Sequence, residues 1–137
     1  MDGINNSELI TAGGYTQTEA ERIKAEAQVL RAMLYLDLIR NFGDLPMKME
    51  SSKPDLSNAY LAKTDRDVIL DYLINDLEDA AEHLSWAGSV STEHVTKGYA
   101  HSLLANIALT RAGWAIRESA KAGYETAPNS DAAYPTQ

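Results

Sequence analysis

The sequence predicts an all-α domain built from antiparallel helical hairpins. Three segments carry apolar residues at intervals of three and four, which is the spacing of an amphipathic helix. No segment sustains the alternation of apolar and polar residues that is typical of a strand. The second and third helical segments are separated by about ten residues, and such a short connection favours antiparallel packing. Pairs of this kind build tetratricopeptide arrays, although the consensus of that repeat, with its period of roughly 34 residues, is absent.

The 137 residues are enough for one domain with its own core, and we divide them into three parts. Residues 1–17 are rich in Gly, Asn, Thr and Ser and lack periodicity, so we expect a loop or flexible lead-in. Residues 18–114 hold the helical domain. Residues 115–137 are expected to form a loop or short helical tail, truncated in the middle of a connection.

The first helical segment begins, by prediction, with a capping box formed by Thr18 and Glu21. Further apolar residues widen its surface, which indicates a helix covered on more than one side. Gly43 and Pro46 should end it, since glycine permits a left-handed cap and proline cannot continue a helix. We expect Leu30→Asp to unfold the domain by burying a charge, because Leu30 belongs to the predicted core stripe. That stripe comprises Ile23, Ala27, Leu30, Leu34 and Leu38.

The two later helical segments have recognisable beginnings. The second starts near Thr64, where an acidic first turn suits the helix dipole. The third has Thr96 as its N-cap and Gly113 as its C-cap. The connection at 44–63 is long for a compact domain, and such connections are often functional. The apolar face of the second segment, in which Leu77→Asp should also unfold the domain, comprises Val68, Ile69, Tyr72, Leu73, Leu77, Ala80, Ala81 and Leu84.

Charge and composition exclude several classes of function. The formal net charge is −8, from 20 acidic and 12 basic residues, and no basic cluster suits a nucleic-acid backbone. Much of the acid lies at 65–82, which we interpret as a solvated helix face rather than an acidic docking surface. No apolar run approaches the roughly 20 residues of a membrane span. Without cysteine, the chain has no disulfide, no thiolate metal site and no lipidation cysteine among these residues.

Few residues suggest catalysis or metal binding. The histidines, His83, His94 and His101, lack the three- or four-residue spacing of a helical zinc pair, so we expect no metal and no other cofactor. Asp76 and Asp79 lie one helical turn apart, and paired carboxylates can perform acid–base chemistry when a pocket shifts one pKa. Nothing in the sequence indicates such a pocket, so no catalytic residue is assigned.

Two tryptophans are the candidate ligand-binding residues. Trp86 follows the second predicted helix, and Trp114 follows the third. An exposed aromatic ring offers an apolar face on which a sugar can stack, so both are candidate glycan contacts. The alternative is that each ring caps the hydrophobic core, and the sequence leaves the choice open.

Four segments together resemble the SusD/RagB family of outer-membrane nutrient-binding lipoproteins of Bacteroidetes. At 26–46, a glutamate precedes Leu-Arg-Ala, an aromatic-containing helix and Phe-Gly-Asp-Leu-Pro. At 66–84, the pattern Ile-x-Asp-Leu-x-x-Ala includes Asp76. The other two segments are 95–105 and the pair at 113–114. Each motif alone is weak, but their order and spacing agree across roughly residues 20–114.

The resemblance implies a non-catalytic protein that captures oligosaccharide and delivers it to a TonB-dependent, SusC-like transporter. It also implies a surface-exposed lipoprotein of the cell outer membrane, attached only through a lipid anchor upstream of these residues. Arg31, Gly43, Pro46 and Asp76 match the family pattern in structural roles, with Arg31 as a semi-buried ion-pair partner. Family members are several times longer, and their glycan contacts lie largely outside the matching motifs, so none is carried over.

Two other functions compete with glycan capture. The first is a tetratricopeptide-type module for protein–protein interaction, which predicts a groove lined by helix residues. The second is a helical glycosidase, which predicts a carboxyl group with a raised pKa in a cleft, and loss of hydrolysis when Asp76 or Asp79 is replaced.

Overall fold

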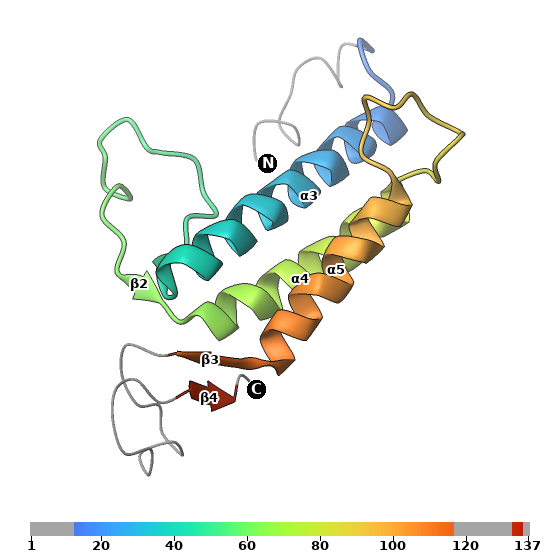
Figure 1. The fold of residues 1–137 in the computed structure, drawn as a ribbon. Helices are drawn as coiled ribbons and strands as arrows, with labels where there is room; N and C mark the ends of the chain where they lie inside the picture. Colours follow the sequence, from blue (N-terminus) through green and yellow to red (C-terminus); the bar gives the residue numbers. More distant parts are fainter. Residues whose placement is uncertain (1–12, 117–132, 136–137) are drawn as a thin grey trace.

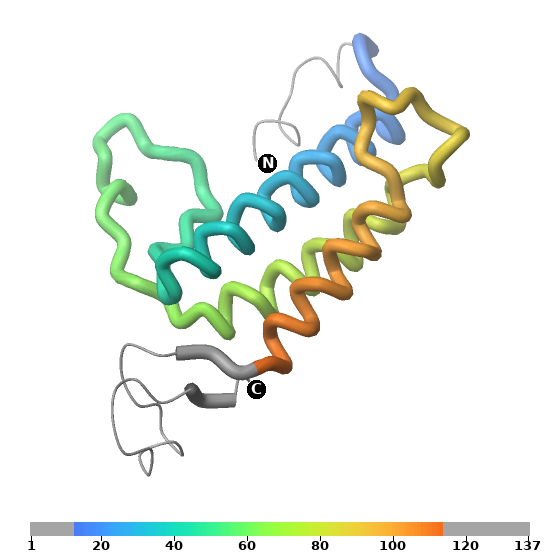
Figure 2. The backbone as a smooth tube through the Cα atoms, viewed as in Figure 1, coloured from blue at the N-terminus to red at the C-terminus, as the bar shows by residue number. Residues whose placement is uncertain are grey.

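The computed structural model describes residues 13–116 and 133–135, and three antiparallel helices dominate it (Figure 1). The helices are α3 (Gln17–Phe42), α4 (Arg66–His83) and α5 (Lys97–Ala112). α4 packs against both neighbours, whereas α3 and α5 contact each other much less. The backbone trace shows the same order, with α4 following α3 in the opposite direction and α5 returning beside α4 (Figure 2). The prediction of a helical fold built from antiparallel hairpins is confirmed.

The described residues also contain short strands, which the sequence did not predict. β1 (Leu45–Pro46) pairs with β2 (Lys63–Thr64) antiparallel, and β3 (Trp114–Ile116) pairs with β4 (Ala133–Pro135) in the same way. The prediction of a loop or helical tail at 115–137 is therefore wrong where β3 and β4 lie. Residues 117–132 of that tail, like residues 1–12 of the predicted lead-in, are outside the described part. Strands this short are too brief for period-two alternation to be recognised.

Local capping rules locate most helix ends. α3 begins with a capping box, but Thr16 and Glu19 form it rather than the predicted Thr18 and Glu21. The backbone N–H of Glu19 donates to Thr16 Oγ1 (3.2 Å), and the Thr16 N–H donates to Glu19 Oε2 (2.9 Å). Both pairs fit the same four-residue pattern, so the pattern alone could not choose between them.

The other two helices begin at short polar side chains. The N-cap of α4 is Asp65, one residue after the predicted start at Thr64, and its carboxylate accepts from the Asp67 N–H at 2.7 Å. α5 is capped by Thr96 and ends at Gly113, as predicted.

Gly43 ends α3 in a backbone conformation that favours glycine. Its φ of 72° and ψ of −120° lie outside the left-handed helical region that the sequence predicted, although φ is positive. A Cβ at this position would meet nothing within 4 Å, so only backbone strain opposes a side chain. Pro46 follows in β1, paired with Lys63.

We expect Gly43→Ala to lower the free energy of unfolding by about 1–3 kcal/mol, because alanine rarely adopts this conformation. Gly43→Asn should lower it by a similar amount, since asparagine tolerates the left-handed helical region but not this ψ. Urea titration of both variants checks the expectation. A stability equal to that of the wild type would contradict the assigned backbone strain.

The hydrophobic core lies along α4, between α3 and α5. Its largest fully buried side chains are shared by the three helices, and β1 adds Leu45 at one end. Because α4 contacts both neighbours, it contributes more of this core than either of them. The fully buried large side chains are Val29, Ile39, Ile69, Leu70, Leu73, Leu77 and Ile107.

The predicted core stripe of α3 is wrong, because the opposite side of the helix faces α4. Leu30, Leu34 and Leu38 are exposed. The expected unfolding by Leu30→Asp loses its basis, since a charge at Leu30 would stay in water. Val68 and Tyr72 of α4 are also exposed rather than buried. Periodicity shows that α3 has apolar residues along one side. The helix in fact has two apolar sides, and the neighbouring helices determine which of them is buried. The side that packs comprises Ala25, Val29, Ala32, Leu36 and Ile39.

Candidate functional site

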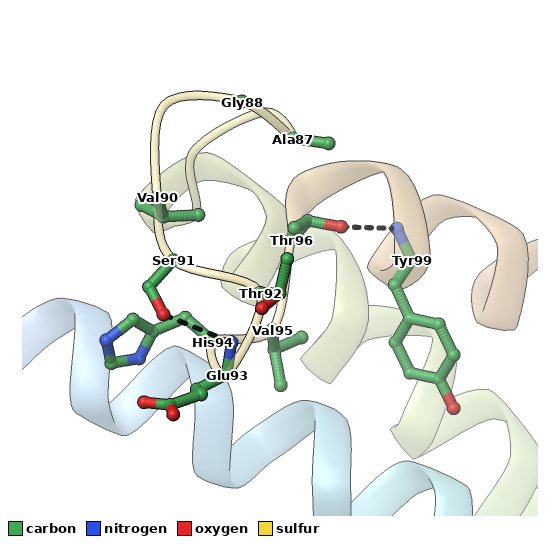
Figure 3. Close-up of a pocket in the computed structure, with 10 residues that line it drawn as sticks. All are labelled: Ala87, Gly88, Val90, Ser91, Thr92, Glu93, His94, Val95, Thr96 and Tyr99. Carbon is green, nitrogen blue, oxygen red and sulfur yellow. Dashed lines mark hydrogen bonds between the residues drawn. The ribbon is translucent and has the colours of Figure 1, made fainter.

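The connection between α4 and α5, residues 84–96, arches over an open cavity of about 420 Å³ (Figure 3). Most of the lining comes from this loop, and the first turn of α5 adds Tyr99. The lining is rich in groups that can hydrogen-bond a polar ligand: the hydroxyls of Ser91, Thr92 and Thr96, the carboxylate of Glu93 and the ring of His94. Most of the lining surface is nevertheless apolar, so the cavity suits a small ligand that presents both apolar faces and hydroxyl groups.

Backbone hydrogen bonds and a contact with α3 hold this loop in place. The Lys97 N–H donates to the Ser85 carbonyl (2.8 Å), which closes the loop at its base. His94 reaches α3, where its Nδ1 lies 3.1 Å from both Arg22 Nη1 and Glu26 Oε1. The loop that lines the cavity is therefore held by contacts at all three helices.

Trp86 lies at the start of the same loop and is 60% exposed, so it does not cap the core. Its ring packs over Gly98, where an added Cβ would lie 3.7 Å from the ring, and stands 6.0 Å from the His101 ring at a tilt of 36°. These contacts orient the indole while leaving much of it in water. Trp114, the other predicted contact, opens β3, and its side chain is outside the described part of the structure.

A polar clamp joins α3 to α4 at the residues that carry the sequence motif. Gln28 Nε2 donates to Asp76 Oδ1 (2.8 Å) and to Asp79 Oδ2 (3.0 Å). Arg31 Nε donates to Asp76 Oδ2 (3.1 Å), and Arg31 Nη2 forms an ion pair with the same oxygen. The Arg31 guanidinium also lies 5.4 Å from the centre of the Tyr72 ring. We call these residues, Gln28, Arg31, Asp76 and Asp79, the α3–α4 clamp.

The clamp gives its carboxylates a structural environment rather than a catalytic one. The hydrogen bond from Gln28 holds the pKa of Asp79 below its ordinary value, and Lys24 lowers it further. A glycosidase acid needs the opposite shift. Asp76 is 9% exposed and directs both oxygens to α3, so it has no open side toward a cleft. The prediction that the acidic residues of α4 face solvent is wrong at this position, because Asp76 is buried and paired.

Gln28 is the centre of the clamp, yet it is absent from the residues that the sequence singled out. The available signal was a glutamine on the side of α3 that also carries Ala25, Val29 and Ala32. A polar side chain on an apolar side needs a buried partner. The partner, Asp76, lies 48 residues away, which sequence spacing cannot reveal.

A second ion-pair cluster joins α4 to α5. Arg111 Nε donates to Asp71 Oδ1 (2.8 Å), and Arg111 Nη1 lies 3.6 Å from Asp67 Oδ2. The hydrogen bond to Asp71 raises the pKa of Arg111 above its ordinary value. Asp67 is buried as well, so the acid of α4 serves partly to fix both neighbouring helices.

Neither a metal cluster nor a membrane helix occurs in the part of the chain that the structure describes. No three His, Cys, Asp or Glu side chains there gather in a metal-binding arrangement. None of the helices at 13–116 is long and apolar enough to cross a bilayer.

The geometry described above is a three-helix scaffold with a polar α3–α4 clamp and an exposed tryptophan in one loop, and comparison with known proteins shows which proteins share it. No family model matches the chain. A SusD-like protein of Bacteroides ovatus is 27% identical over 111 residues, which cover 81% of this chain and 20% of that protein. The chain thus spans about a fifth of the length of the relative it matches.

Solved structures agree with the sequence match. A SusD-like carbohydrate binding protein from Bacteroides fragilis superposes with a TM-score of 0.62 at 22% identity, over 69% of this chain and 19% of that chain. A second SusD-like protein from the same species gives a TM-score of 0.62 at 24% identity, with the same coverage. At these identities the structures establish the fold. Together with the sequence match, they confirm the resemblance: the chain is homologous to SusD-like proteins.

Proposed function

We propose that this chain is part of a non-catalytic protein that captures oligosaccharide at the cell surface and delivers it to a TonB-dependent transporter. The observation that carries the proposal is the sequence match to a SusD-like protein over 81% of the chain. One matched structure is described as carbohydrate binding, which supports sugar as the ligand class. The proposal includes a place on the outer membrane, with a lipid anchor supplied by an upstream segment.

Within this chain, we propose that the loop at 84–96 contacts the sugar. An exposed indole can stack on the apolar face of a pyranose, and the hydroxyls and carboxylate of the neighbouring cavity can bind sugar hydroxyls. Trp86, which precedes the residues that line the cavity, would supply the stacking surface, and Glu93 and His94 would supply polar groups from the cavity lining. Trp114 remains a proposed second contact.

We expect Trp86→Ala to weaken binding of a recognised polysaccharide by about tenfold or more, since a stacked aromatic is a typical hot spot. Affinity electrophoresis through native gels containing starch, xylan, mannan or levan measures this directly. Trp86→Phe should keep part of the affinity, and the matched control Tyr60→Ala, at a 96% exposed ring in another loop, should keep all of it.

The outcomes separate the site from the function. Binding that is unaffected by Trp86→Ala would contradict the loop as the sugar site. If the full-length protein is not retarded by any glycan across a broad panel, glycan capture itself is contradicted. Co-purification of the full-length protein with a TonB-dependent transporter tests delivery, and failure to co-purify from native membranes would contradict that step.

A protein-interaction module remains the second candidate because of one observation. A second cavity, of about 380 Å³, is lined mainly by helix residues, among them Ile39, Leu70 and Leu109. Such a helix-lined groove is what an interaction module requires. The exposed Trp86 and the cavity, both in the loop at 84–96, together with the sequence match, favour the sugar proposal.

A further inference from the structure

The outward side of α3 carries a continuous apolar stripe. Leu30, Leu34, Leu38 and Phe42 recur every four residues and are 47%, 57%, 42% and 66% exposed. Residues four apart lie on one face of a helix, so these side chains form a single row. Ile23, one heptad before Leu30, extends the row toward the start of the helix and is 36% exposed. We call these five residues the outer stripe.

The outer stripe lies opposite the side of α3 that is already packed. At 3.6 residues per turn, Leu34 and Leu36 point in directions about 160° apart. Leu36 and Val29 are buried against the rest of the core, whereas Leu34 is exposed. A helix that is apolar on two opposite sides is typical of a helix buried between two layers. Only one of these layers, α4 with α5 behind it, lies within the described residues.

The lengths of the relatives indicate what covers the other side. The matched region makes up 20% of the Bacteroides ovatus protein and 19% of a solved Bacteroides fragilis chain. In those proteins the same unit is accompanied by about four times as much additional polypeptide. A second copy of this chain is a poorer occupant, because each copy carries a formal charge of −8 and the copies would repel each other.

We infer that the outer stripe is the docking face for a further amphipathic helix of the longer polypeptide to which this chain corresponds. The occupant presents its own apolar row to Leu30, Leu34 and Leu38. Covalent attachment raises its effective concentration, so the contact needs no separate association step. This inference rests on the burial pattern and the lengths of the relatives, and it is independent of sugar binding.

The absence of cysteine from the chain provides a direct test by thiol labelling. Leu34→Cys is made both in the 137-residue chain and in the longest polypeptide encoded by the same reading frame. Each protein is labelled with a maleimide, and the rate at this site is followed by peptide mass spectrometry. We expect labelling to be at least about tenfold slower in the longer polypeptide, because docking buries the thiol there.

Control variants separate docking from general effects. Glu78→Cys, at an exposed position of α4, should label at the same rate in both proteins. Circular dichroism checks that each variant keeps its helices, and Leu38→Cys replaces Leu34→Cys if that variant does not fold. Equal labelling rates in the two proteins would overturn the inference. So would a reading frame that adds no helical segment, or protection in the 137-residue chain that grows with protein concentration, which would indicate a second copy. None of these outcomes involves a glycan, so they leave the sugar proposal unaffected.

Discussion

Replacing Leu77 with aspartate is expected to unfold the three-helix unit. Leu77 is fully buried in the core along α4. A carboxylate there would be buried without a partner, at a cost of several kcal/mol. Small domains are stable by only about 5–15 kcal/mol, so such a cost removes much or all of the stability. The expected result is loss of the helical circular dichroism signal, or of the cooperative thermal transition, at room temperature.

The matched control introduces the same charge on the other side of α3. Leu34→Asp places a carboxylate at a 57% exposed position, where water can solvate it. In the 137-residue chain this variant should keep its thermal transition within a few degrees of the wild type. A Leu77→Asp protein that melts like the wild type would contradict the assignment of the core.

Asp76→Ala should be the next most damaging change, at about 2–4 kcal/mol of unfolding free energy. The Asp76 carboxylate accepts from both Gln28 and Arg31, and alanine would remove the ion-pair partner of Arg31 and leave Gln28 with Asp79 as its remaining acceptor. Arg31 keeps 17% of its side-chain surface exposed, so water offsets part of the loss, and the figure is lower than for a fully buried pair. Urea-induced unfolding, monitored by circular dichroism, measures the change.

Two comparisons show whether the clamp, rather than helix content, is responsible. Glu78→Ala, at an exposed site two residues along α4, should change stability by less than about 0.5 kcal/mol. In a double-mutant cycle, Arg31→Leu should be less harmful when Asp76 is already alanine, because the ion pair is then absent. A coupling energy near zero would mean that the Arg31–Asp76 pair contributes nothing to stability.

Local rules predicted the parts of the fold that depend on neighbouring residues. The cap at Thr96, the end of α5 at Gly113 and the positive φ of Gly43 all follow from short-range chemistry. Which side of α3 is buried against the core was not predictable in this way. A helix with apolar residues on both sides satisfies the periodicity test in two orientations, and only the position of α4 decides between them.

The candidate site was less predictable than the fold, since it depends on exposure and on contacts between distant residues. The sequence left Trp86 as a candidate sugar contact or a core cap, and only its exposure in the structure excludes the core cap. The cavity in the loop at 84–96 is lined mainly by loop residues without periodicity, so no sequence pattern predicted it. Gln28 was missed because its partner is distant in sequence.

The ladder between β1 and β2 has a consequence for how this protein can diversify. By pairing Leu45 with Thr64 and Pro46 with Lys63, it fixes the two ends of the intervening segment, residues 47–62, beside each other. The entropy of closing a loop changes only slowly with its length. Insertions or deletions between these fixed ends therefore need not alter the geometry of the helices. A tag inserted at 49–62, beyond Met47 at the core and Lys48 at Tyr35, is expected to leave the scaffold intact.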